Sequence, residues 1–198
     1  MPHGIKQSAV WQPDTYQLAD IARVHPKDWS RIEAKASELV FTPHVKWLHH
    51  FLIGQYLADE NDYVIYESIP SHGVAIGRLS WYDGYGYSVL RLNRPDSAQI
   101  GAKVIEDVSL FGRRPYGYPS MIELIGELIG IEYASWKVCH KLKAVTAYDV
   151  RLSDQGLFCT QLVWETYLKT GVSILPLGAA ALPCAFQEAI EDGILIEV

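Results

Sequence analysis

The feature that most constrains the fold is a pair of β-rich runs on either side of a short polar turn. Residues 49–57 (HHFLIGQYL) and residues 63–69 (YVIYESI) are rich in aromatic and β-branched side chains. The segment between them, ADEND at residues 58–62, is a cluster of turn-forming residues. This pattern predicts a β-hairpin and favours an antiparallel sheet.

The rest of the chain adds further strands and several helices. Apolar alternation and apolar runs predict strands over residues 18–24, 72–82, 87–92 and 194–198. Apolar spacing predicts helices over residues 97–112 and 119–140. Start and stop signals predict helices over residues 27–39 and 159–169, and a short helix is expected over residues 185–193. Strands and helices are mixed in this order without a linker or an internal repeat, which predicts an α+β fold and a single domain spanning residues 1–198.

Composition and charge exclude some classes of partner. The chain has 198 residues, of which 49% are hydrophobic, and a formal net charge of −6. Without a basic excess, nucleic-acid binding and attachment to an anionic membrane are not expected. No signal-peptide pattern and no run of eighteen apolar residues is found, so we expect a cytoplasmic protein without membrane insertion. The expected partner is a small molecule or a peptide.

The number and spacing of the cysteines argue against disulfides and against a zinc site. There are three, at positions 139, 159 and 184, with no C-x-x-C pair. An odd number without metal-ligand spacing fits neither a disulfide framework nor a structural zinc site. A cluster of His44, His49 and His50 matches no zinc signature either. We therefore expect no metal and no cofactor.

Cys159 stands at the predicted start of a helix, directly after a glycine turn in DQGLFCTQLVWETYLKTG. The unpaired N–H groups and the positive dipole end of a helix lower a thiol pKa, and the N–H of the cysteine can face a developing oxyanion. The alternative is a packing role, because cysteine is often buried.

Candidate partners for the thiol lie in the predicted hairpin. His49 and His50 open its first strand, and strand alternation sends them to opposite faces, so only one can face the Cys159 helix. Glu67 is an acid in an otherwise apolar strand, where an unpaired carboxylate would be costly to bury. A symmetric hairpin does not place Glu67 directly opposite His50, so their pairing needs a diagonal contact or a shifted register.

These segments, in this order, resemble the circularly permuted NlpC-type papain-like cysteine peptidases and amidases, also called YiiX-like, which are relatives of lecithin retinol acyltransferase. The resemblance rests on LADIARV, HHFLIGQYL, YVIYESIPSHGV, YSVLRL, GRRPYGYP and FCTQLVWETYLKTGV, from about residue 18 to residue 171. In this permutation the histidine precedes the cysteine. The sequence departs from the pattern at Ala19, where the family has glycine, at His49, where it has serine, and at Thr160-Gln161, where Ser-Glu is usual.

The resemblance implies a papain-like antiparallel sheet or partial barrel, packed against a helix that carries the nucleophilic cysteine. It also implies that Cys159 is the nucleophile, His50 the base and Glu67 the residue that orients the base. The implied activity is amide hydrolysis through a thioester, with a peptide or a small amide or ester as the substrate. The alternatives are an acyltransferase of the lecithin retinol acyltransferase type and an inactive ligand-binding domain of the same fold. The loop at residues 113–118 either lines the cleft or is a solvated turn.

Overall fold

The computed structural model describes residues 15–25, 47, 49–69, 72–112, 114–117, 157–176, 181 and 183–198. The predicted helices over residues 27–39 and 119–140 lie outside these ranges, as does Cys139. Within the described part of the chain, no helix is both long and apolar enough to cross a membrane.

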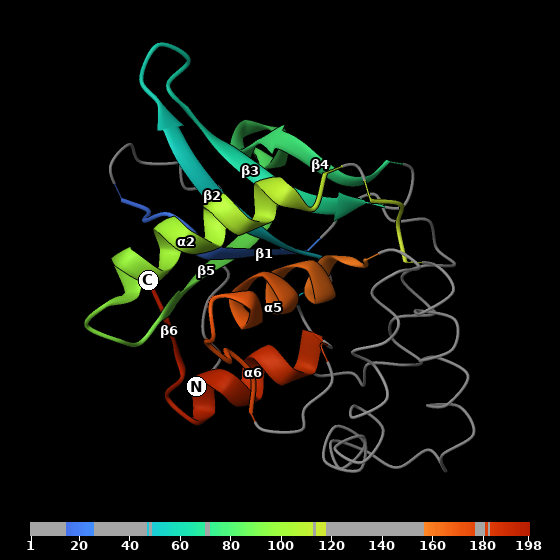
Figure 1. Cartoon of the computed structure of the whole chain (residues 1–198). Helices are drawn as coiled ribbons and strands as arrows, with labels where there is room; N and C mark the ends of the chain where they lie inside the picture. Colours follow the sequence, from blue (N-terminus) through green and yellow to red (C-terminus); the bar gives the residue numbers. More distant parts are fainter. Residues whose placement is uncertain are drawn as a thin grey trace.

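A six-stranded antiparallel sheet forms the centre of the structure, with the strand order β4-β3-β2-β1-β5-β6 (Figure 1). Strands β2 and β3 form the predicted hairpin. The strands are β1 (Ile21–His25), β2 (His49–Leu57), β3 (Asp62–Ile69), β4 (Gly73–Arg78), β5 (Gly86–Leu92) and β6 (Leu195–Glu197). The predicted α+β class is therefore confirmed.

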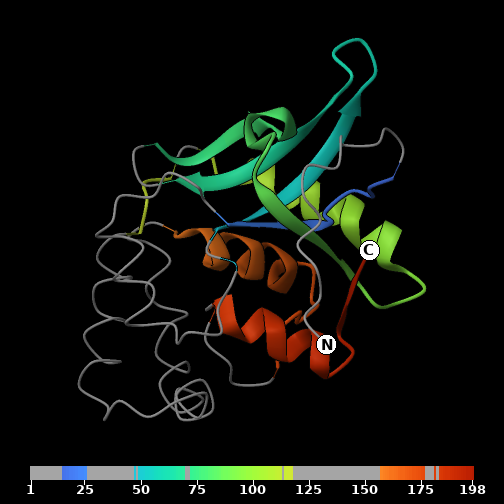
Figure 2. The same cartoon turned by 180° about the vertical axis from the view of Figure 1, so that it is seen from behind.

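Helices cover one face of this sheet. They are α2 (Ser97–Leu110), α5 (Cys159–Lys169) and α6 (Pro183–Glu191), and both views place them on the same side (Figures 1 and 2). Their buried side chains share one apolar cluster with the sheet; among its members are Ile21, Leu52, Leu90, Val104, Leu162 and Phe186. Burying this cluster is the main source of stability for the layered arrangement.

The other face of the sheet has its own, smaller cluster. It contains Ala22, Val24, Phe51, Ile53, Tyr63, Ile65, Leu79 and Val89. Leu79 belongs to η1 (Leu79–Tyr82), a single turn of 3-10 helix directly after β4. The prediction of a strand over residues 72–82 is thus too long, because β4 ends at Arg78. The side chain of Asp62 accepts hydrogen bonds from the N–H and the hydroxyl of Ser80, which favours a turn over further extension.

The first strand also begins later than predicted. Ala19 has a φ of 65°, in the left-handed region that interrupts a strand and favours glycine. The next residue, Asp20, is buried and receives two hydrogen bonds from Arg91, of 2.9 and 2.6 Å. Regular pairing of β1 then starts at Ile21.

A β-bulge in β2 shifts the register of the hairpin by one residue. Near the turn, Tyr56 pairs with Tyr63; beyond the bulge, Ile53 pairs with Ile65. Two residues of β2, Gly54 and Gln55, therefore occupy the space opposite one residue of β3. A one-residue shift exchanges the two faces of a strand, so the bulge decides which side chains of β2 meet those of β3.

Candidate active site around Cys159

Cys159 is the first residue of α5 and is 7% exposed. The residue before it, Phe158, is extended and accepts the first helical hydrogen bond, from Leu162. The helix ends as predicted, with Gly171 at a φ of 82°. The thiol therefore sits at the end of a helix where N–H groups have no intrahelical partner.

Leu157, two residues before the cysteine, is held by several backbone contacts. Its N–H donates to the carbonyl of Pro115, and its carbonyl accepts from the N–H of Gly117 and from the hydroxyl of Ser68. The segment at residues 114–117 is in turn joined to β4, because Val74 donates to the carbonyl of Arg114. The described part of the predicted loop at residues 113–118 thus lies beside the start of α5, and it is not simply a solvated turn.

His49 and Glu67 form a buried pair beside the start of α5. His49 Nε2 lies 2.9 Å from Glu67 Oε2, and the two residues are 6% and 1% exposed. A carboxylate accepts hydrogen bonds, so Nε2 is the donor. The His49 ring also makes a hydrogen bond with the side chain of Cys159. Since Nε2 is used by Glu67, Nδ1 is the nitrogen that faces the thiol.

The electrostatics of this cluster favour a charged pair. Burial by itself lowers the pKa of His49, but hydrogen bonds and charge from Cys159 and Glu67 outweigh it and raise the pKa to about 9. Burial also raises the pKa of the Cys159 thiol, yet His49 and the backbone N–H groups of His50 and Thr160 hold that pKa below its ordinary value. The two shifts together favour a thiolate beside an imidazolium.

The structure does not bring His50 together with Glu67. The His50 side chain points to the helix side of the sheet, where its ring lies 4.6 Å from the ring of Phe186. It is fully buried, and neither ring nitrogen has a hydrogen-bond partner among the described residues. Burial, with the charges of Arg23 and His49, lowers its pKa well below the ordinary value. His49 takes the place expected for His50, because the bulge shifts the register of β2 by one residue and so exchanges its two faces.

A tyrosine that the sequence analysis missed completes the cluster. The hydroxyl of Tyr82, in η1, donates a hydrogen bond to Glu67 Oε2, the oxygen that also accepts from His49. Nothing in the sequence pattern singles out this tyrosine among twelve. The sequence did contain a signal that His49 would replace His50. An isolated glycine inside a strand pattern, such as Gly54, indicates a bulge.

The two residues after the cysteine are both buried, Thr160 at 1% and Gln161 at 4% exposure. The hydroxyl of Thr160 donates to the carbonyl of Ala181, which ties the first turn of α5 to the segment before α6. Gln161 donates from Nε2 to Glu165 over 2.7 Å. These side chains stabilise the start of the helix, and neither makes a hydrogen bond to His49 or Glu67 in the described structure.

Among the described residues, no group of three or more His, Cys, Asp and Glu side chains is arranged to hold a metal ion. His44, which the sequence placed near a possible metal cluster, lies outside the described ranges. A search of protein-family models found none that matches the chain, and a search of curated proteins found no similar sequence.

Proposed function

We propose that the chain is a cysteine-dependent hydrolase of amide bonds, with Cys159 as nucleophile, His49 as general base and acid, and Glu67 as the residue that orients His49. The observation that carries this proposal is the chain of contacts from thiol to imidazole to carboxylate, in which the pKa of the thiol is lowered and that of the imidazole is raised. Structural cysteines in apolar surroundings have raised pKa values, so a packing role does not account for these shifts.

We further propose that the fold is papain-like, of the circularly permuted NlpC type. The histidine strand precedes the cysteine helix in the chain, as the resemblance implies. Ala19 gives additional support, because it stands where the family has glycine and adopts a left-handed φ of 65°. A glycine at that position would serve the same backbone conformation without strain.

The reaction follows from these groups. The Cys159 thiolate attacks the carbonyl carbon of the substrate, and the C–N bond breaks as protonated His49 gives its Nδ1 proton to the departing amine. Water then attacks the thioester while His49 accepts a proton from it, which releases the carboxylic acid and restores the thiolate–imidazolium pair. Glu67 holds the Nε2–H tautomer and stabilises the imidazolium. The backbone N–H of Cys159, at the helix start, is available to the oxyanion.

The first experiment measures the rate of iodoacetamide alkylation of each cysteine against pH, with peptide mass spectrometry as the readout. We expect Cys159 to react well below the ordinary thiol pKa of about 8.5, and to lose that advantage in His49→Ala. The other two cysteines serve as internal references. If Cys159 reacts with the same pH dependence as they do, the charged pair is absent and the proposal fails.

The second experiment tests for turnover with a panel of short peptide amides and the matching esters. Release of amine and carboxylic acid, lost in Cys159→Ala, supports hydrolysis. Transfer of the acyl group to an added amine in preference to water would instead identify an acyltransferase. A thiol of low pKa that turns over no member of the panel would favour a binding domain.

A further inference from the structure

The Tyr82 hydroxyl and the His49 imidazole donate to the same oxygen of Glu67. Two donors converging on one carboxylate oxygen restrict the rotation of that carboxylate more than either donor alone. The Glu67 side chain is 2% exposed, so water does not compete freely for this oxygen. The orientation of the Glu67 carboxylate, and with it that of the His49 ring, therefore depends on the Tyr82 hydroxyl as well.

The ring of Tyr82 also packs on the histidine. Its centroid lies 5.9 Å from that of His49 with an interplanar angle of 30°, and 4.7 Å from that of Phe51 at 25°. Stacked rings at these separations make favourable contacts that also limit tilting. One residue thus touches His49 on its face and holds its carboxylate partner by the hydroxyl.

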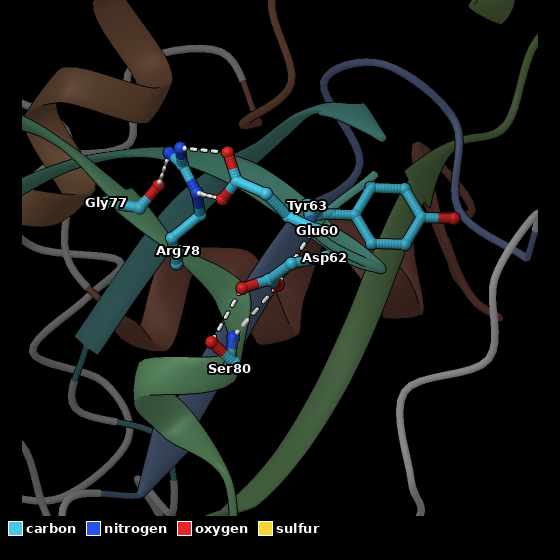
Figure 3. A network of polar contacts seen from close by, with 6 residues as sticks. All are labelled: Glu60, Asp62, Tyr63, Gly77, Arg78 and Ser80. Atoms are coloured by element: carbon cyan, nitrogen blue, oxygen red, sulfur yellow. Dashed lines mark hydrogen bonds and ion pairs between the residues drawn. The ribbon is translucent and has the colours of Figure 1, made fainter. Parts of the chain in front are cut away.

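The segment that carries Tyr82 is itself fastened to the hairpin. Asp62 accepts hydrogen bonds from the Ser80 hydroxyl at 2.6 Å and from the Ser80 N–H at 3.2 Å, and next to it Arg78 pairs with Glu60 at 2.7 and 3.1 Å (Figure 3). Ser80 and Tyr82 belong to the same turn of η1. Contacts at the outer end of β3 therefore set the position of a side chain that contacts Glu67, farther along the same strand.

We propose that Tyr82 is a positioning residue for the Cys159–His49 pair: it holds Glu67 and the His49 ring so that His49 Nδ1 faces the thiol. This inference rests on the proposed function. Tyr82 acts through Glu67 and His49, and no contact with a substrate is assigned to it. Burial and the charge of Glu67 raise the pKa of the Tyr82 phenol, so its hydroxyl stays a donor throughout the neutral range.

The test is the pH dependence of Cys159 alkylation in Tyr82→Phe, which removes the hydroxyl and keeps the ring. We expect the midpoint to move upward, so that the alkylation rate at pH values below the midpoint falls by about three- to tenfold, the factor that corresponds to one hydrogen bond. A residue with a merely structural role would change thermal unfolding and leave this midpoint in place.

A double-mutant cycle separates positioning through Glu67 from a direct effect on the thiol. Glu67→Ala removes the acceptor and should raise the midpoint further than Tyr82→Phe does. The double variant should match Glu67→Ala alone, because the hydroxyl has then lost the group through which it acts. Tyr56→Phe is the matched control, since the Tyr56 hydroxyl donates to Asn61 at the exposed end of the hairpin. It should leave the midpoint unchanged.

The possible results separate this inference from the proposed function. If the unaltered protein shows a low midpoint that Tyr82→Phe does not move, the function stands and the positioning role is overturned. An additive shift in the double variant also overturns it. If the unaltered protein has an ordinary midpoint, both proposals fail. If Tyr82→Phe does not fold although its ring is retained, the hydroxyl serves stability and the positioning role is overturned.

Discussion

His49 Nε2 and Glu67 Oε2 are 2.9 Å apart although the two residues are not paired across the sheet. Extending the register Leu52↔Tyr66 by one residue places Phe51 opposite Glu67, so His49 is the diagonal neighbour on the same face. Without the bulge, the register of the turn would place Leu52 opposite Glu67, and His50 would be that neighbour. The β2 bulge thus selects the histidine that meets the acid.

Gly54→Ala should weaken the bulge. A Cβ at this position would lie 2.8 Å from the ring of Tyr66 and 3.1 Å from the backbone carbonyl of Val64, and the backbone cannot easily move away. We expect a loss of about 1–3 kcal/mol in the free energy of unfolding, measured by urea denaturation. Gln55→Ala, at the exposed neighbouring position, should change stability little. If Gly54→Ala left the free energy of unfolding unchanged, the hairpin would not need the close approach of Gly54 to Tyr66 and Val64.

Substitution of His49 should change the pKa of the Cys159 thiol, and substitution of His50 should not. His49→Ala should return the Cys159 pKa toward its ordinary range, because the main group that lowers it is lost. His50→Leu keeps the backbone N–H that approaches the sulfur and should leave the thiol pKa low. Alkylation against pH distinguishes the two variants, and the reverse result would restore His50 as the base.

Glu67→Gln should reduce activity less than Cys159→Ala or His49→Ala. The amide can still accept a hydrogen bond from Nε2, but it provides no charge to stabilise the imidazolium. The pKa of His49 should therefore fall from about 9, which a ¹H–¹⁵N titration of the ring would detect. Equal losses in all three variants, each folded, would contradict this ranking.

Activity should decline on the alkaline side as His49 loses its proton. The imidazolium must donate to the leaving amine, and His49 in the folded protein has a pKa of about 9. The pKa of His49 is higher in the folded protein than in the unfolded chain. His49 therefore contributes its full stabilisation of the fold at pH values below its pKa in the unfolded chain. The contribution is lost as the pH rises through about 9. Profiles of kcat/KM and of Tm against pH should both show the change, and His49→Ala should remove it from the Tm profile.

His50 should make the fold sensitive to acid. Its pKa in the folded state lies well below the ordinary value of 6.5, so below that value the unfolded chain binds a proton that the folded protein does not. Stability then decreases with falling pH by up to about 1.4 kcal/mol per pH unit. His50→Leu should reduce this loss between neutral and mildly acidic pH, while His25→Gln, at an exposed position, should not. Tm measured against pH in the three proteins gives the answer.

Much of the architecture follows from local sequence. The β-rich runs around ADEND predict the hairpin, and the glycine turn before Cys159 and the stop signal at Gly171 predict the bounds of α5. Glu67 could be selected because a carboxylate in an apolar strand needs a partner. These inferences depend on neighbours in the chain, where propensity, periodicity and turn chemistry act directly.

The identity of the histidine partner depended on the tertiary structure. Alternation shows that His49 and His50 face opposite sides, but a single extra residue in a strand exchanges the sides, and the energy that places it comes from packing across the sheet. The contact of Tyr82 with Glu67 arises likewise from Asp62 and Ser80, on segments that meet only in the folded chain. The sequence by itself determined the chemistry that is available; long-range packing decided which side chains meet.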